Sequence, residues 1–204
     1  MEYLVLGFFT GLSLILAIGA QNVFVIEQGL KKQYIFLVCS VCSLSDLLLI
    51  FLGIFLFHFF HQYFNLFVEL TLNVLLIIFL VYFIYSKIKL ISGTISFNSE
   101  AKDISRIEIL FKTLGFTYLN AHVYSDTVFF LGNFSKNFLL NEKVYFGIGA
   151  SIASFIFFFL LGYLSAYFSK FAQNDKVWKL INLFIITFMS ALAIYIIRET
   201  IYFL

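Results

Sequence analysis

Long apolar stretches constrain this chain more than any other feature of its sequence. A helix needs roughly 20 mostly apolar residues to cross the hydrocarbon core of a bilayer, which is about 30 Å thick. Six stretches of the 204-residue chain meet this requirement. They cover approximately residues 3–26, 34–57, 64–86, 108–133, 144–169 and 177–200. The sequence therefore predicts an all-α membrane protein with about six transmembrane helices.

The composition supports the same class of protein. Only 12% of the residues are charged and 62% are hydrophobic, whereas a soluble domain has about 25% charged residues. The net charge of +2 is carried by connections between spans and gives no reason to expect nucleic-acid binding. The first apolar run is longer than the 7–15 residues of a signal-peptide core, so we expect a retained first span.

Positive charges are distributed unequally between the two sides of the predicted bundle. Three of them, Lys136, Lys143 and Arg198, fall on one side. The other side collects ten: Lys31, Lys32, Lys87, Lys89, Lys102, Arg106, Lys112, Lys170, Lys176 and Lys179. By the positive-inside rule the second side is cytoplasmic, so both termini lie outside. A re-entrant first span would change only the location of the N-terminus.

Two similar polar clusters indicate an internal repeat. The first span contains GAQNVFVI from Gly19, and the fourth contains NAHVYSDTVF from Asn120. Each cluster interrupts the leading helix of a three-helix half, and the second half enters the membrane from the opposite side. Transporters with such inverted repeats bind their substrates between interrupted helices near the bilayer midplane. We predict one transmembrane transporter domain over 1–204, with repeats at about 1–86 and 108–204 and a cytoplasmic loop at about 87–107.

Ionisable residues inside spans are the candidate functional residues, because burying them costs several kcal/mol and they usually face a cavity or a partner. Asp46 lies deep in the second span, on a helical face with small residues. His122 and Asp126 in the fourth span are four residues apart and can share one helical face. The alternative for each acid is a structural role, locking helices together. Three amides accompany these residues and could equally link helices: Gln21, Asn22 and Asn120.

Other small or reactive residues are interpreted as packing residues. Cys39 and Cys42 form a C-x-x-C pattern, but they lie on one helix inside a span, with no helix N-terminus to activate a thiol. The small residues of the first and fifth spans predict close helix packing. These residues are Gly7, Gly11, Gly147, Ser151 and Ser154. No catalytic triad, phosphate-binding loop or zinc-ligand spacing is present, so we expect neither an enzyme nor a cofactor or metal site.

Four stretches resemble the LysE family of amino-acid exporters, in particular its lysine/arginine exporter branch. They are GAQNVFVIEQGLKKQY from Gly19, SLSDLLLIFLGIF from Ser43, YLNAHVYSDTVFFLG from Tyr118 and KVWKLINLFI from Lys176. The neutral amino-acid branch typically has Asn-Asn where this chain has Gln21 and Asn22. The family usually has Pro where this chain has Ala20 and Ala121. The breaks must then come from Gly19 and side-chain competition, or the helices are less broken.

The resemblance implies a multi-pass secondary transporter of the bacterial inner membrane that exports arginine, lysine or both. We expect proton antiport, because inward return of one proton would cancel the charge that a basic amino acid carries out. Its partners are then the basic amino acid, protons and the lipid bilayer. The implied substrate-binding residues are Gln21, Asn22, Asp46, Asn120, His122 and Asp126, with backbone breaks at Gly19, Ala20 and Ala121. Proton coupling is assigned to Asp46, His122 and Asp126.

Two alternatives stay open at this point. An exporter with the same fold could carry neutral amino acids or metal cations. A membrane thiol–disulfide electron carrier is a further possibility, although it would need cysteines on two separate helices. The sequence leaves open the choice between arginine and lysine, the coupling stoichiometry and whether the protein is a homo-oligomer.

Overall fold

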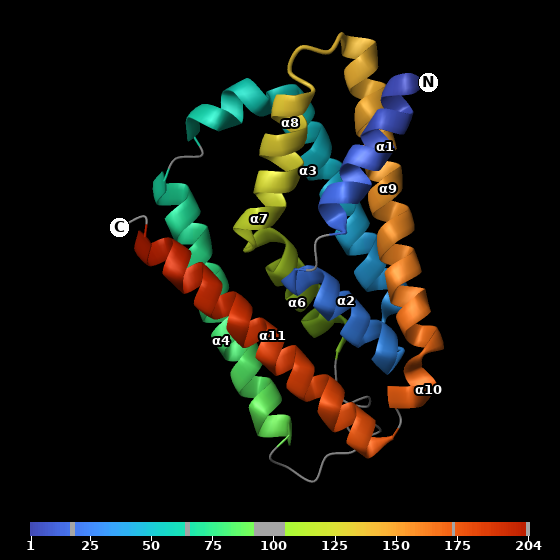
Figure 1. Ribbon diagram of the computed structural model, residues 1–204, viewed down its shortest axis with the longest axis vertical. Coiled ribbons are helices and arrows are strands. Elements are labelled where there is room, and N and C mark those ends of the chain that lie inside the picture. The colour runs from blue at the N-terminus through green and yellow to red at the C-terminus, as the bar shows by residue number, and fades with distance from the viewer. Residues whose placement is uncertain (17–18, 64–65, 92–104, 173, 203–204) are drawn as a thin grey trace.

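The computed structural model describes residues 1–16, 19–63, 66–91, 105–172 and 174–202, without the side chains of some helical residues such as Ala121 and His122. These ranges form helices joined by short connections (Figure 1). The first half contains α1 (Glu2–Ile15), α2 (Ala20–Lys31), α3 (Ile35–Tyr63) and α4 (Leu66–Ile91). The second half contains α6 (Arg106–Tyr118), α7 (Ala121–Tyr124), the π-helix η1 (Ser125–Phe130), α8 (Leu131–Phe134), α9 (Leu140–Tyr167), α10 (Ser169–Ala172) and α11 (Asp175–Tyr202).

Three helices within the described ranges are long and apolar enough to cross a membrane. They correspond to Ile35–Phe57, Leu140–Tyr167 and Lys176–Arg198. The pair α1 and α2 makes a fourth candidate if the two helices form one span. The predicted class, a helical membrane protein, is therefore confirmed, whereas the count of six spans stays a prediction.

The first and fourth predicted spans are each interrupted. α1 ends at Ile15 and α2 begins at Ala20 after a bend of 83°. In the fourth predicted span α6 ends at Tyr118 and α7 begins at Ala121. Ala at the first helical position is thus compatible with a break. Gly19 precedes α2 in an extended conformation, with φ −118° and ψ −178°, so the chain turns without proline.

Small residues allow the helices to approach closely, as predicted. α1 packs along α9, where an added Cβ at Gly7 would lie 2.0 Å from the carbonyl oxygen of Phe146. α3 crosses η1 and α8 in the same way, since a Cβ at Gly53 would lie 2.6 Å from the backbone of Val128. Through these crossings α3 contacts α9, η1 and α8, and α1 lies along α9 (Figure 1).

A cluster of aromatic rings packs α2 and α6 against each other and against α4. The ring of Phe116 on α6 lies 4.8 Å from that of Phe24 on α2 and 5.1 Å from that of Phe83 on α4. All three side chains are buried. α2 and α6 are therefore held side by side, and α6 also contacts α4.

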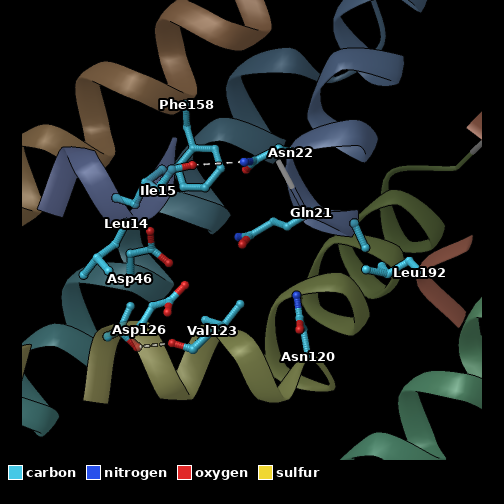
Figure 2. Close-up of a pocket in the computed structure, with 13 residues that line it drawn as sticks. Leu14, Ile15, Gln21, Asn22, Asp46, Asn120, Val123, Asp126, Phe158 and Leu192 are labelled. Atoms are coloured by element: carbon cyan, nitrogen blue, oxygen red, sulfur yellow. Dashed lines mark hydrogen bonds between the residues drawn. The ribbon is translucent and has the colours of Figure 1, made fainter. Parts of the chain in front are cut away.

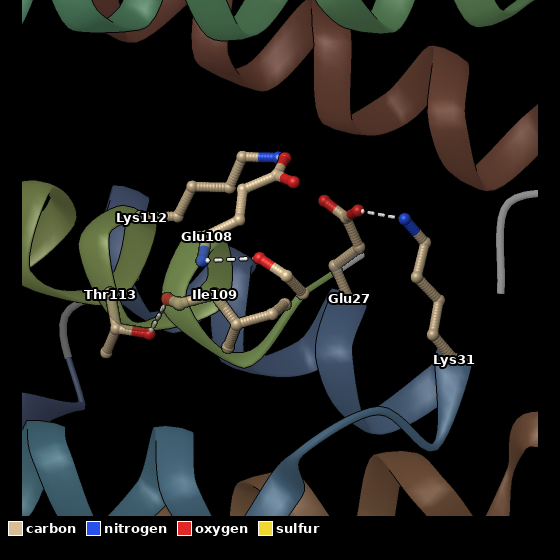
Figure 3. Close-up of polar contacts among 7 residues, drawn as sticks. Glu27, Lys31, Glu108, Ile109, Lys112 and Thr113 are labelled. Carbon is tan, nitrogen blue, oxygen red and sulfur yellow. Dashed lines mark hydrogen bonds and ion pairs between the residues drawn. The ribbon is translucent and has the colours of Figure 1, made fainter. Parts of the chain in front are cut away.

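The connection between the predicted spans 3–26 and 34–57, residues 27–33, differs from its prediction. We expected a short polar linker, but α2 continues to Lys31, and Glu27 and Lys31 are only 2% and 6% exposed. Lys31 Nζ lies 2.7 Å from Glu27 Oε1 (Figure 3), so each charge is balanced by its neighbour one turn away. A polar run can extend a buried helix when its charges are paired in this way.

The loop expected at 87–107 is shorter than predicted at both ends. α4 continues to Ile91, and α6 begins at Arg106. The Ser105 side chain accepts a hydrogen bond from the Glu108 backbone nitrogen at 3.1 Å, which caps the start of α6 (Figure 3). Residues 92–104, the centre of the predicted loop, lie outside the described ranges.

Candidate functional site

A cavity of about 340 Å³ lies where the two interrupted helices meet. Both interruptions border it, the first through Gly19 and the second through Asn120. Its lining comes from α1, α2, α3, α7, η1, α9 and α11, and from the residues at the two breaks. The lining residues are Leu14, Ile15, Gly19, Ala20, Gln21, Asn22, Asp46, Asn120, Val123, Asp126, Thr127, Phe158 and Leu192.

Two carboxylates share this cavity. Asp46 comes from α3 and Asp126 from η1, and Figure 2 shows their carboxylates directed toward one another. Asp46 is 3% exposed and accepts a hydrogen bond from Ser154 Oγ on α9 at 2.8 Å. The cavity therefore concentrates negative charge on one wall, at a point where three helices meet.

The predicted amides line the cavity as well, and two of them link helices. Gln21 Nε2 donates to Thr117 Oγ1 on α6 at 3.0 Å. Asn22 Nδ2 donates to the carbonyl oxygen of Ile15 at 3.1 Å, so it satisfies the end of α1 across the break. The functional and structural interpretations of these amides are thus compatible, because each both borders the cavity and holds a neighbouring element.

The start of α2 is the electropositive part of the cavity wall. Its first residues, Ala20, Gln21 and Asn22, line the cavity together with Gly19 before them. The first backbone N–H groups of a helix have no partner within the helix, and the helix dipole adds a partial positive charge there. Figure 2 shows Gln21 across the cavity from the two carboxylates.

Four other residues singled out in the sequence are not among the described residues that line the cavity: Ala121, His122, Cys39 and Cys42. Ala121 and His122 begin the second broken segment, α7, but their side chains lie outside the described part of the structure. Cys39 and Cys42 are buried free thiols, and Cys39 Sγ donates to the carbonyl oxygen of Phe158 at 3.2 Å. This agrees with their interpretation as packing residues.

Several residues at the site were missed by sequence reasoning. Phe158 and Leu192 close the cavity from α9 and α11, and apolar residues in apolar spans carry no signal of such a role. Ser154 was interpreted as a packing residue, and its bond to Asp46 spans 108 positions. Thr127 follows Asp126 in η1, whose π-helical turn has no visible sequence signature. Such turns are frequent at functional sites.

The cavity suits a small molecule that carries both a carboxylate and positive charge. Its volume lies at the lower end of the range usual for small-molecule sites. One wall offers two carboxylates for cations, and another offers a helix N-terminus for an anion. Leu14, Ile15, Phe158 and Leu192 add apolar surface to the same cavity, which suits an alkyl chain.

Comparison with known proteins identifies relatives over nearly the whole chain. The model of the LysE type translocator family matches residues 12–200. The chain is 31% identical over 200 residues to the arginine exporter protein ArgO of Salmonella enteritidis PT4 and to that of Salmonella typhimurium. Each match covers 98% of this chain and 95% of the relative. No solved structure gives a significant match.

Proposed function

The chain belongs to the LysE type translocator family, and we propose that it exports a basic amino acid, arginine or lysine, across the bacterial inner membrane. The observation that carries this proposal is the pair of carboxylates, Asp46 and Asp126, in one cavity at the junction of two broken helices. Charges in such a position are costly unless they serve a ligand or a partner.

The cavity walls suggest how the substrate is oriented. The cationic side chain would lie against Asp46 and Asp126, and the α-carboxylate would lie at the first turn of α2. Gln21 and Asn120 would complete the polar contacts, because both line the same space. Ser154 would hold the Asp46 carboxylate in place through its hydrogen bond.

Proton antiport is the coupling that this charge arrangement favours. Arginine and lysine have a net charge of +1 at neutral pH, and moving it out against an inside-negative potential costs about 2.3 kcal/mol per 100 mV. Inward return of one proton cancels that charge movement. A carboxylate that binds either a proton or the substrate cation would couple the two by competition. Asp46 and Asp126 are the carboxylates proposed to do this, and His122 is proposed to act with Asp126 in proton entry.

The proposed architecture is a single domain of six spans in two inverted repeats. The interrupted pair α1 and α2 would lead the first repeat, and α6 with α7, η1 and α8 would lead the second. Two observations support this arrangement: both leading segments are broken, and both breaks border the cavity. The second repeat would run through the membrane in the direction opposite to the first. Both α2 and α6 would then lie on the cytoplasmic side of the membrane.

Efflux from reconstituted vesicles tests the proposal. Vesicles holding the purified protein should release labelled arginine or lysine, faster when a proton gradient is imposed in the antiport direction. Asp46→Asn keeps the size and hydrogen-bonding capacity of the side chain but removes its charge, so efflux should fall to the level of empty vesicles. Asp175→Asn makes the same chemical change outside the predicted spans and should leave efflux unchanged.

Other substrates in the same assay distinguish the alternatives. Release of neutral amino acids or of divalent metal cations, with no release of arginine or lysine, would refute the proposed substrate while leaving the transporter fold in place. Normal arginine efflux by Asp46→Asn would instead show that Asp46 is structural and that the cation binds elsewhere.

A further inference from the structure

Gly19 differs from the other described glycines in the space beside it. Apart from its own chain neighbours, a Cβ added at Gly19 would have no heavy atom within 4 Å. At every other described glycine, an added Cβ would come within 3.0 Å of a neighbouring atom. Those glycines are required by helix packing, as at Gly53, where the nearest atoms belong to the backbone of Val128. Packing therefore does not explain a glycine at position 19.

The backbone conformation does not explain Gly19 either. Its φ of −118° and ψ of −178° are accessible to any residue. Gly19 is also the N-cap of α2, a position where Ser, Asn and Asp stabilise a helix better than glycine does, because their side chains bond the first N–H groups. Local stability thus favours a side chain at this position, although the chain has none.

The remaining distinctive property of Gly19 is its place in the cavity wall. It lines the cavity immediately before the first turn of α2, so a side chain on it would extend into open space. We infer that Gly19 is a specificity-determining residue that keeps open the space for the α-amino and α-carboxylate end of the substrate. This inference rests on the proposed function, and it adds a limit on the length of the substrate.

The limit follows from the two ends of the cavity. The substrate cation is assigned to Asp46 and Asp126, and the opposite end is assigned to the start of α2, beside Gly19. A side chain at position 19 would shorten the distance available between these ends. Arginine should then lose more than ornithine, whose side chain is shorter by an amidine group.

Three variants of graded size test this role: Gly19→Ala, Gly19→Ser and Gly19→Val. Each is reconstituted at equal protein level, and efflux of labelled arginine and ornithine is measured together with the melting temperature in detergent. Side-chain carbon atoms that intrude on space already filled by another group usually cost about 1–3 kcal/mol, which corresponds to about a tenfold loss of affinity or more. Arginine efflux should decrease with side-chain size, to about one tenth or less in Gly19→Val, and the arginine-to-ornithine ratio should fall.

Gly19→Ser separates this role from a structural one. As a better N-cap, Ser should keep or raise the melting temperature, and yet arginine efflux should fall. Gly53→Ala is the packing control, and it should lower the melting temperature or the yield of folded protein. This opposite behaviour of stability and transport at position 19 is not expected of a residue that merely shapes the turn.

Two results would overturn the inference. One is arginine efflux that stays unchanged in Gly19→Val, since the space beside Gly19 would then be unused. The other is a loss of efflux that follows the loss of folded protein in all three variants. Both are distinct from failure of the proposed function, in which the unaltered protein itself would release neither arginine nor lysine.

Discussion

Replacing Ala20 with proline tests whether the first predicted span is truly two helices. Ala20 is the first residue of α2, and the N–H of a first helical residue has no acceptor within the helix. Proline, which lacks this N–H, therefore removes no helical hydrogen bond there. Gly19 already has the extended conformation that proline requires of the residue before it. Ala20 is fully buried and borders the cavity.

The expected magnitude follows from these conditions. Proline at a compatible position stabilises by about 0.4–1 kcal/mol, because it restricts the unfolded chain. Proline inside a continuous helix costs about 3 kcal/mol. Ala20→Pro should thus be neutral or stabilising, and adding Ala121→Pro at the first residue of α7 should also be tolerated. Ala153→Pro is the matched control, since Ala153 is 0% exposed like Ala20 but lies inside α9.

Thermal unfolding of the purified proteins in detergent measures these differences, and arginine efflux shows whether the site survives. Ala20→Pro should melt at or above the temperature of the unaltered protein, whereas Ala153→Pro should melt well below it or fail to accumulate. Equal destabilisation by Ala20→Pro and Ala153→Pro would refute the reasoning. α1 and α2 would then be one continuous helix, and a site built on their break could not exist.

Three further predictions concern the polar groups of the spans. Ser154→Ala removes the hydrogen-bond donor to Asp46, and a hydrogen bond to a charged group is worth about 1.5–3 kcal/mol. The apparent affinity for arginine should therefore fall about tenfold or more, and Ser154→Thr, which keeps the hydroxyl, should restore it. His122→Gln replaces an imidazole, whose unperturbed pKa is about 6.5, with a side chain that cannot be protonated. The pH dependence of efflux between about pH 5.5 and 8 should therefore flatten, and an unchanged profile would make His122 structural. Replacing Cys39 and Cys42 together by Ala should leave efflux intact, and loss of a redox activity in that variant would favour the electron-carrier alternative.

The apolar spans and the two breaks could be predicted from the sequence for a simple reason. Lipid demands about 20 apolar residues per helix and penalises every polar group inside one. The stretch 34–57 thus becomes the apolar part of α3, and the clusters at Gly19 and Asn120 become interruptions. The same penalty makes Asp46 and Asp126 conspicuous, because each is an acid within an otherwise apolar stretch.

The extent of each helix was less predictable where charges are paired. Glu27 and Lys31 resemble a polar linker, because a sequence does not show whether a charge is balanced. In the structure they form an ion pair of 2.7 Å, which allows α2 to remain helical and buried. The π-helical turn at Ser125–Phe130 was not predicted either, since it depends on how η1 packs against α3.

The sequence by itself determined that this chain is a helical membrane protein, where its helices break and which acids lie within its apolar stretches, because solvation by lipid acts on each segment separately. Only the tertiary structure decided that both breaks and both acids border one cavity, that Ser154 is the partner of Asp46, and that the space beside Gly19 is open. These properties depend on distances between residues about a hundred positions apart, and such distances follow from how the helices pack against one another.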